Sequence, residues 1–427
     1  MHHLSSRRWR AAAAGATALA LVLTGCAAED SFSYTPPEQV DAALADETTA
    51  QLQAAVENAM VATGSTGAIV GVWVPWSGTW VTGLGTQSVE DQSEVTTDMT
   101  FRIADVTRMM TCDVLYGLAD DDVVELDASV PEYVSGVAHL EDVTLLDLCN
   151  GTSGIGSSEA TVKGMWLNTP KRVWSPLELA SFGLGQDPVT PHTTYRDSDA
   201  GYLLLGLALE RAAGESASEL IAEYVTTPLE LTGTSLPGPT AATPGDIALS
   251  GTYLPAVEGG FDCAARSEIT VMSASTGFTD SGAVSTIDDL GRYVQATARQ
   301  GLREEGAKPD RFSAPLPAYE GADSWYQATG GAFLVGPLVG QHGWTPGYAT
   351  AAYADPTTGF TVAVVLNNST AGSSPAAYLA WELAAIASKA PAAAGETVPE
   401  FGLPFTAEQY HQAITDNAIC ATPPAAE

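Results

Sequence analysis

Positively charged residues are scarce in this sequence. Its 427 residues include 17 Lys and Arg but 51 Asp and Glu, which gives a formal net charge of −34. Three of the basic residues lie in a removable leader, so the mature chain would carry 14 basic and 51 acidic residues, a net charge of −37. A surface this acidic repels nucleic acid and anionic lipid headgroups. We therefore expect no nucleic-acid partner and interpret the charge as a source of solubility or salt tolerance.

Lysine is the scarcest charged residue, and its distribution bears on catalysis. The residues that stand three positions before the four lysines are Ala160, Asn168, Glu305 and Ile386. The chain therefore has no Ser-x-x-Lys, the pattern in which serine attacks and lysine helps to manage its proton. The G-x-S-x-G elbow is also absent, since the chain around Ser153 reads G-x-S-G, where we expect the hydroxyl to serve a turn. A Ser-His-Asp triad built from distant residues has no local support.

The N-terminus has the pattern of an export signal. A basic stretch at 7–10 precedes an apolar run at 11–24 that is too short to span a bilayer. Leu-Thr-Gly-Cys at 23–26 then resembles a bacterial lipobox, which implies acylation of Cys26 and cleavage before it. We predict a lipoprotein signal peptide at 1–25 and a chain anchored to the outer face of the cell membrane by a lipid on Cys26. The alternative to a lipoprotein signal is an ordinary signal peptide. The sequence does not decide between Sec and twin-arginine export.

Composition divides the remaining chain into three parts. Residues 26–47 are acidic and contain Pro36-Pro37, which is typical of a linker that lifts a domain off the membrane. Residues 48–390 carry the periodic apolar pattern of a folded domain. Residues 391–427 are acidic and rich in Pro and Ala, and we expect a draped, partly disordered tail there.

Periodicity within 48–390 predicts helices around an antiparallel sheet. Helices are expected at 48–63, after Asp105, twice within 203–234, after a cap at Ser285 or Thr286, and at 374–389. Strands are expected at 67–74, 78–85, 332–335, 338–343, 348–354 and 360–367, while 240–279 is expected to be mostly loop. Gly and Pro separate the later strands closely enough for a meander. The predicted fold class is therefore α/β (α+β).

One stretch, FRIADVTRMMTC at 101–112, organises the functional argument. Asp105 and Arg108 stand three residues apart, so on a helix they share one face. The stretch resembles the first motif of serine beta-lactamases, DD-peptidases and related class C type esterases, usually F-R-I-A-S-V-T-K. The resemblance holds on both sides of Asp105, but Asp105 occupies the position of the serine nucleophile and Arg108 the position of the lysine.

Two later motifs repeat this pattern of intact flanks and altered chemistry. PHTTYRDSDAGYLLLG at 191–206 resembles P-G-T-x-F-x-Y-S-N-x-G-Y-x-L-L-G, which puts Asp197 at the family tyrosine and Asp199 at the family asparagine. GQHGWTPGY at 340–348 resembles G-H-x-G-G-T-P-G-Y, with Gln341 at the position of a cation or donor and Gly343 retained. His342 is shifted by one, so strand alternation points it to the other face unless a β-bulge restores it.

The resemblance covers about residues 50–390. It implies a beta-lactamase/transpeptidase-like fold, in which an antiparallel sheet flanked by helices carries a mostly helical lobe. It also favours disulfides Cys112–Cys149 and Cys263–Cys420, because in the family the helix after the first motif packs near the segment of Cys149. Export permits disulfides, four cysteines allow three pairings, and buried free thiols remain an equal alternative.

The altered motifs predict a catalytically inactive homologue of the penicillin-binding-protein-like enzymes. We expect a binding or scaffold lipoprotein at the cell envelope that needs no cofactor and no metal, with a cell-wall peptide or small molecule as its ligand. The predicted cleft residues are Asp105, Arg108, Asp197, Asp199, Gln341 and Gly343. A structural salt-bridge cluster that fills a cleft without a function is an equally weighted alternative.

Two enzymatic alternatives also remain. The carboxylates beside the arginine could do acid/base hydrolysis or hold calcium. If the motifs are misregistered, the chain would be an active serine hydrolase, that is, a beta-lactamase, D-Ala-D-Ala carboxypeptidase or esterase.

Overall fold

The computed structural model of this protein describes residues 34–420. The predicted leader and Cys26 lie outside the described residues. Along the part of the chain that the structure describes, every helix is too short or too polar to cross a membrane.

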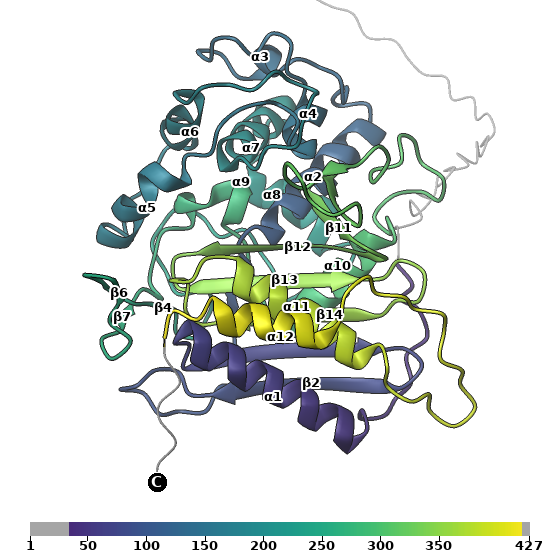
Figure 1. Ribbon diagram of the computed structural model, residues 1–427. Helices are drawn as coiled ribbons and strands as arrows, with labels where there is room; N and C mark the ends of the chain where they lie inside the picture. The colour runs from purple at the N-terminus through teal and green to yellow at the C-terminus, as the bar shows by residue number, and fades with distance from the viewer. Residues whose placement is uncertain (1–33, 421–427) are drawn as a thin grey trace, which may run out of the picture. The chain divides into compact units, whose positions relative to one another are not determined.

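An eight-stranded antiparallel sheet forms the centre of the described fold (Figure 1). Its strand order is β2-β1-β14-β13-β12-β11-β10-β9. The strands are β1 (Gly67–Val74), β2 (Gly78–Gly85), β9 (Leu316–Pro317), β10 (Tyr326–Thr329), β11 (Ala332–Val335), β12 (Leu338–Thr345), β13 (Tyr348–Ala354) and β14 (Thr361–Leu366). This confirms the predicted N-terminal hairpin and the C-terminal meander, which meet where β1 pairs with β14.

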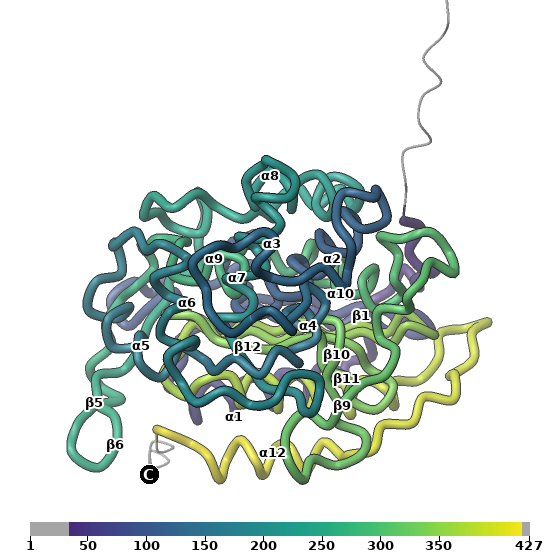
Figure 2. The backbone as a smooth tube through the Cα atoms, turned by 90° about the horizontal axis from the view of Figure 1, so that it is seen from above, coloured from purple at the N-terminus to yellow at the C-terminus, as the bar shows by residue number. Residues whose placement is uncertain are grey.

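Three helices cover one face of the sheet. They are α1 (Asp46–Thr63), α11 (Ser374–Ala387) and α12 (Ala407–Asp416). Helix α11 is apolar nearly all round, as expected for a helix packed between the sheet and other helices. Figure 2 shows the C-terminal segment with α12 on the other side of β12 from α2 and α7.

Helix α12 differs from the tail predicted after position 390. Thr406 caps its first turn by accepting a hydrogen bond from the backbone N–H of Gln409. Tyr410 and Ile414, four residues apart, are buried. The Pro- and Ala-rich composition around the helix hid this short amphipathic pattern.

The opposite face of the sheet carries α2 (Val106–Asp120) and α10 (Ile287–Ala298), which Thr286 caps as predicted. Beyond α2 lies the helical lobe. It comprises α3 (Val130–Tyr133), α4 (Leu145–Asn150), α5 (Glu159–Asn168), α6 (Pro176–Leu184), α7 (Asp199–Ala213), α8 (Ala217–Ile221) with a π-helical turn at Ala222–Thr226, and α9 (Phe278–Ser281) after a 3-10 turn at Ala274–Thr276. The lobe and the sheet therefore meet around the N-terminus of α2.

Three two-stranded ribbons complete the described chain. They pair β3 (Phe101–Arg102) with β8 (Val284–Ser285), β4 (Thr252–Tyr253) with β7 (Ser267–Glu268), and β5 (Ala256–Val257) with β6 (Gly260–Phe261). The first ribbon fixes the entry to α2, because β8 holds the two residues that precede the turn into the helix.

Two disulfides staple distant segments, in the pairing that the family resemblance favours. Cys112 in α2 bonds Cys149 in α4, with Cα atoms 5.6 Å apart. Cys263 bonds Cys420, with Cα atoms 5.9 Å apart. The first holds the helical lobe against α2, and the second ties the end of the described chain to the loop after β6.

Candidate functional site

The site begins at the turn from β3 into α2. Ala104 is fully buried and has a φ of 49°, a left-handed conformation that is uncommon for a residue with a Cβ atom. Asp105 follows at the N-cap of α2, but its carboxylate makes no capping hydrogen bond. Strained backbone of this kind gathers at functional sites. The Asp105 carboxylate instead faces Arg108, in the first turn of the same helix.

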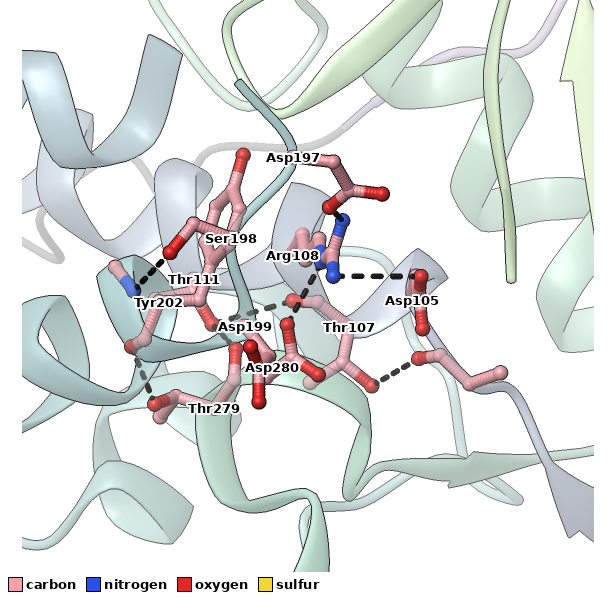
Figure 3. A network of polar contacts seen from close by, with 12 residues as sticks. Asp105, Thr107, Arg108, Thr111, Asp197, Ser198, Asp199, Tyr202, Thr279 and Asp280 are labelled. Atoms are coloured by element: carbon pink, nitrogen blue, oxygen red, sulfur yellow. Dashed lines mark hydrogen bonds and ion pairs between the residues drawn. The ribbon is translucent and has the colours of Figure 1, made fainter. Parts of the chain in front are cut away.

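Arg108 is the centre of a buried ion cluster (Figure 3). Its Nε donates to Asp280 Oδ1 at 2.7 Å, and its Nη1 donates to Asp197 Oδ1 at 2.6 Å. Its Nη2 lies 3.4 Å from Asp105 Oδ2, and its guanidinium lies 5.0 Å from the ring centre of Tyr202. The side chain is 4% exposed. One cation is thus shared among three carboxylates.

Asp280 is a member of this cluster that the sequence analysis missed. It lies in α9, 172 residues from Arg108 in sequence, beside a segment predicted to be loop. Hydroxyl groups hold α9 in place. Thr111 donates to the carbonyl of Thr279 at 2.6 Å, and Thr279 donates to the carbonyl of Tyr202 at 2.8 Å (Figure 3). These bonds join α2, α7 and α9, so Asp280 is held at a fixed distance from Arg108.

The charges of the cluster are unevenly exposed, and burial shifts their titration. The Asp280 side chain is 6% exposed, that of Asp105 14% and that of Asp197 60%. Burial raises the pKa of Asp105 well above its usual range and that of Asp280 to about 6, while Arg108 opposes both shifts. Burial alone would lower the pKa of Arg108, but the three carboxylates reverse this effect and raise it. Arg108 is therefore a permanent cation and cannot act as a base.

Asp199 lies beside the cluster without bonding to Arg108. Its Oδ1 accepts hydrogen bonds from the Ser157 hydroxyl at 2.8 Å and the Ser158 backbone N–H at 2.6 Å. Its Oδ2 is buried and has no partner among the described residues. Burial raises its pKa, although both bonds oppose the shift. Asp199 therefore ties the start of α5 to the start of α7, where an acidic residue also suits the helix dipole.

Gln341 lies on β12 with both ends of its amide in use. Its Nε2 donates to the carbonyl of Gly331 at 3.0 Å, and its Oε1 accepts from the backbone N–H of His342 at 2.9 Å. The side chain thus extends the hydrogen bonding of β12 just past its pairing with β11, which ends at Gly340. Gly331 occupies one of the two N–H groups of this amide, and the Gln341 side chain is buried.

His342 points to the opposite face of β12, as strand alternation predicts. The ladder with β13 runs without a bulge, with Gln341 opposite Ala352 and His342 opposite Ala351. The His342 ring stacks on Phe333 and its Nδ1 lies 2.6 Å from the hydroxyl of Tyr353. Burial lowers its pKa to about 4, so the ring is neutral at pH 7. His342 supplies no cation to the cleft.

Gly343 and Asp105 are in direct contact. A Cβ atom built on Gly343 would lie 2.1 Å from Cγ of Asp105. It would also lie 2.4 Å from Cβ of Asp105, so the side chain at 105 requires glycine at 343 already at its first carbon and not only through its carboxylate.

Trp344 is a further residue that the sequence analysis passed over, although the quoted motif carries glycine there. Its Nε1 donates to Glu159 Oε1 at 2.9 Å, and the Lys163 ammonium lies 4.3 Å from the centre of its ring system. Trp166 packs on it at 6.4 Å. These contacts attach α5 to the end of β12 beside Gly343, and burial raises the pKa of Glu159.

The arrangement has the contacts of an ion cluster and not of a metal centre. Within residues 34–420, no three His, Cys, Asp or Glu side chains are grouped so that they could hold a metal ion. The carboxylates of Asp105, Asp197 and Asp280 all point at Arg108.

Most of the chain matches a known protein family. The family model described as Beta-lactamase matches residues 52–386. Among curated proteins, the probable fimbrial assembly protein FimD, serogroup H1, of Dichelobacter nodosus is 24% identical over 128 residues. That match covers 29% of this chain and 32% of the relative, so it spans about a third of the relative's length.

Solved structures share the fold. The D-amino acid amidase from Ochrobactrum anthropi SV3 has a TM-score of 0.65 and 20% identity, over 76% of this chain and 92% of that one. A D-stereospecific amidohydrolase from Streptomyces sp. has a TM-score of 0.63 and 19% identity, over 75% and 94%. The octameric penicillin-binding protein homologue from Pyrococcus abyssi has a TM-score of 0.61 and 20% identity, over 79% and 76%. These likenesses confirm the predicted beta-lactamase/transpeptidase-like fold.

Proposed function

The chain belongs to the beta-lactamase family, and we propose that it is a non-catalytic member that serves as a lipid-anchored binding or scaffold protein at the cell envelope. The observation that carries this proposal is the ion cluster around Arg108. Asp105 stands where the family motif has its serine, and its carboxylate faces Arg108 at 3.4 Å instead of presenting a hydroxyl. Losing a nucleophile of this kind costs about 10⁶ in turnover in serine hydrolases.

The surrounding groups support the same conclusion. Arg108 cannot take a proton from a nucleophile, because its pKa is raised and it is already bound by carboxylates. Gln341 is buried, carries no charge and donates from Nε2 to Gly331. The excess of negative charge opposes a ligand carboxylate of the kind that penicillins and peptide C-termini carry.

A ligand of this site would meet Asp197 first. Of the three carboxylates around Arg108, Asp197 is the most exposed, at 60%. We therefore propose that a cell-wall peptide or small molecule engages the protein through groups that can donate to Asp197. The export signal at 1–25 and the lipid on Cys26 belong to this proposal, since they would place the protein where such ligands occur.

Covalent labelling tests the proposal. The purified chain is incubated with a fluorescent penicillin and analysed by intact-mass spectrometry, and turnover of nitrocefin and D-phenylalanine amide is followed in parallel. We expect no adduct and no turnover. A matched variant restores the motifs with the changes Asp105→Ser, Arg108→Lys, Asp197→Tyr, Asp199→Asn and Gln341→His, which is the smallest set that we expect to acylate. A penicilloyl adduct on the natural chain would refute the non-catalytic assignment.

One observation favours a second candidate, a carboxylate-based hydrolase. A carboxyl group with a pKa of about 6, such as Asp280, lies in the range that general acid/base catalysis requires. Against this, Asp280 is nearly buried behind Arg108. Amide turnover that Asp280→Asn abolishes and penicillin leaves unaffected would establish this function instead.

A further inference from the structure

A small pocket lies where helix α10 packs on strand β1. Its volume is about 220 Å³, and Pro36 and Pro37 of the segment at 34–39 form one of its walls. None of the residues that line it belongs to the ion cluster around Arg108. Because sites for drug-sized molecules commonly have volumes of about 300–1,000 Å³, this pocket suits a smaller ligand.

Trp73 forms the apolar surface of the pocket, and two glycines make room for it. A Cβ atom built on Gly71 of β1 would lie 2.1 Å from Cη2 of Trp73, and one built on Gly291 of α10 would lie 2.5 Å from the same atom. The six-membered ring of the indole is therefore held against the backbone of both elements. The side chain is only partly buried, and its Nε1–H donates to no atom of residues 34–420. The indole thus offers a ligand an apolar face and an unused donor.

Two opposite charges line the pocket from one face of α10. Asp288 and Arg292 are four residues apart, and Gly291 lies on the same face. Side chains at this spacing have Cβ atoms about 5–6 Å apart. Asp288 is exposed and the Arg292 side chain is 33% exposed, so a solute can reach both charges.

The guanidinium of Arg292 is held at one end and open at the other. Its Nε donates to the carbonyl of Leu229 at 2.6 Å. Its Nη2 lies 4.0 Å from a carboxylate oxygen of Glu230, whose side chain is 85% exposed, and a pair of this kind contributes little in water. Arg292 is therefore positioned by a neutral carbonyl and keeps its charge for an anionic group, for which guanidinium is well suited.

Asp288 has no ion-pair partner among the described residues, although Arg292 lies one turn away on the same helix. Burial and the adjacent Asp289 both raise its pKa, since both disfavour the charged carboxylate. A cation beside Asp288 would oppose both effects. Within residues 34–420, no His, Cys, Asp and Glu side chains are grouped so that they could hold a metal ion, so an organic ammonium group is the cation that suits this carboxylate.

We propose that this pocket binds a small zwitterion, an amino acid whose ammonium and carboxylate groups are separated by a short alkyl chain. The ammonium group donates to Asp288, the carboxylate accepts from Arg292, and the alkyl chain lies on the indole of Trp73. Because the two protein charges are one helical turn apart and do not pair, the ligand's own charges must also be several atoms apart. The site is independent of the function proposed above.

Isothermal calorimetry on the full chain tests this assignment with 4-aminobutyrate as the probe. Butylamine and butyrate, each of which lacks one of the two charges, are the ligand controls. We expect saturable binding of 4-aminobutyrate and at least about fivefold weaker binding of each control, because one charged contact at a partly exposed site contributes a factor of about that size.

Two variants remove the protein charges one at a time. Asp288→Asn should weaken binding of 4-aminobutyrate by at least about fivefold, so that it binds no better than butyrate. Arg292→Gln should weaken it by a similar factor, so that it binds no better than butylamine. Both side chains reach the surface, and the unfolding temperatures of the variants, measured in parallel, show that they fold.

Matched control variants lie outside the pocket. Asp46 is also an exposed acid in the first turn of a helix, and Arg211 is also a helical arginine that donates to a backbone carbonyl, that of Tyr133. Asp46→Asn and Arg211→Gln should change the affinity for 4-aminobutyrate by less than about twofold.

Three results would overturn the proposal. The first is that the natural chain shows no saturable binding of 4-aminobutyrate. The second is that butylamine or butyrate binds as tightly as 4-aminobutyrate. The third is that Asp288→Asn and Arg292→Gln change the affinity no more than the matched controls do, since the net charge of the chain and not the pocket would then govern binding.

Discussion

Replacing Arg108 with methionine removes the only cation from a cluster of three carboxylates while keeping much of the side-chain volume. Asp280 then loses the 2.7 Å bond from Nε and remains nearly buried. Asp105 loses its partner at 3.4 Å and is also largely shielded from water. Asp197 loses a 2.6 Å bond but is 60% exposed, so water replaces its partner. The loss of stability in Arg108→Met therefore comes mainly from Asp280 and Asp105.

The size of the effect follows from these burials. Removing one partner of a buried ion pair destabilises a protein by about 3–5 kcal/mol, because the other charge is left without compensation. The exposed pair with Asp197 adds at most about 1 kcal/mol. Asp280→Asn should cost less, about 1–3 kcal/mol, because Arg108 keeps two carboxylates. In the double variant Arg108→Met/Asp280→Asn the buried charge at 280 is absent, so the loss should be smaller than the sum of the single losses by at least about 1.5 kcal/mol.

Urea unfolding at pH 7 of the natural chain, the two single variants and the double variant measures this double-mutant cycle. The matched control is Arg172→Met, since Arg172 also pairs with a carboxylate, Glu178, but both side chains are more than 40% exposed. That variant should lose less than about 1 kcal/mol. If Arg108→Met lost no more than Arg172→Met, or if the cycle showed no coupling, the cluster would not hold the buried charges together and the account of the site would be wrong.

Three further outcomes follow from the same structure. Asp105→Ser alone should remain inert toward nitrocefin, because the neighbouring carboxylates raise the pKa of Arg108, which stays a cation and cannot deprotonate the new hydroxyl; robust turnover would show that catalytic electrostatics survive. Lowering the pH from about 7.5 to about 5 should raise the free energy of unfolding of the natural chain relative to that of Asp280→Asn, because the raised pKa of Asp280 makes it bind its proton more tightly in the folded chain, and this contribution is lost as the pH rises through the folded pKa of about 6. Urea titrations of both chains at both pH values measure this difference. Cys26→Ser should release the protein from membranes or leave an unprocessed precursor, and membrane fractionation of a processed protein that stays bound would contradict the lipid anchor.

The sequence predicted the parts of the fold that have a local signature. The N-terminal hairpin, the meander and α11 have clear apolar periods, and each forms close to its expected bounds. Asp105 and Arg108 could be paired from their spacing on one helix face, and the flanks of the second motif brought Asp197 to the same place. These inferences needed only short-range geometry or intact motif flanks.

The remainder of the site depended on contacts between segments far apart in the chain. Asp280 lies in a four-residue helix whose position is set by hydroxyl bonds to α2 and α7, which no local pattern encodes. Asp199 was expected in the cleft from its motif position, but its contacts are with Ser157 and Ser158. Similarly, α12 is a short amphipathic helix that becomes stable by packing on α11, so composition alone described it as a tail.

The contact between Asp105 and Gly343 makes the mutational routes away from this site unequal. A larger residue at 343 clashes with the carboxylate at 105, whereas a smaller residue at 105 leaves Arg108 with less compensation. Selection for a stable fold should therefore preserve the aspartate, the arginine and the glycine as a group. Among descendants of this gene, we expect positions 105, 108 and 280 to change together or not at all, and position 343 to remain glycine.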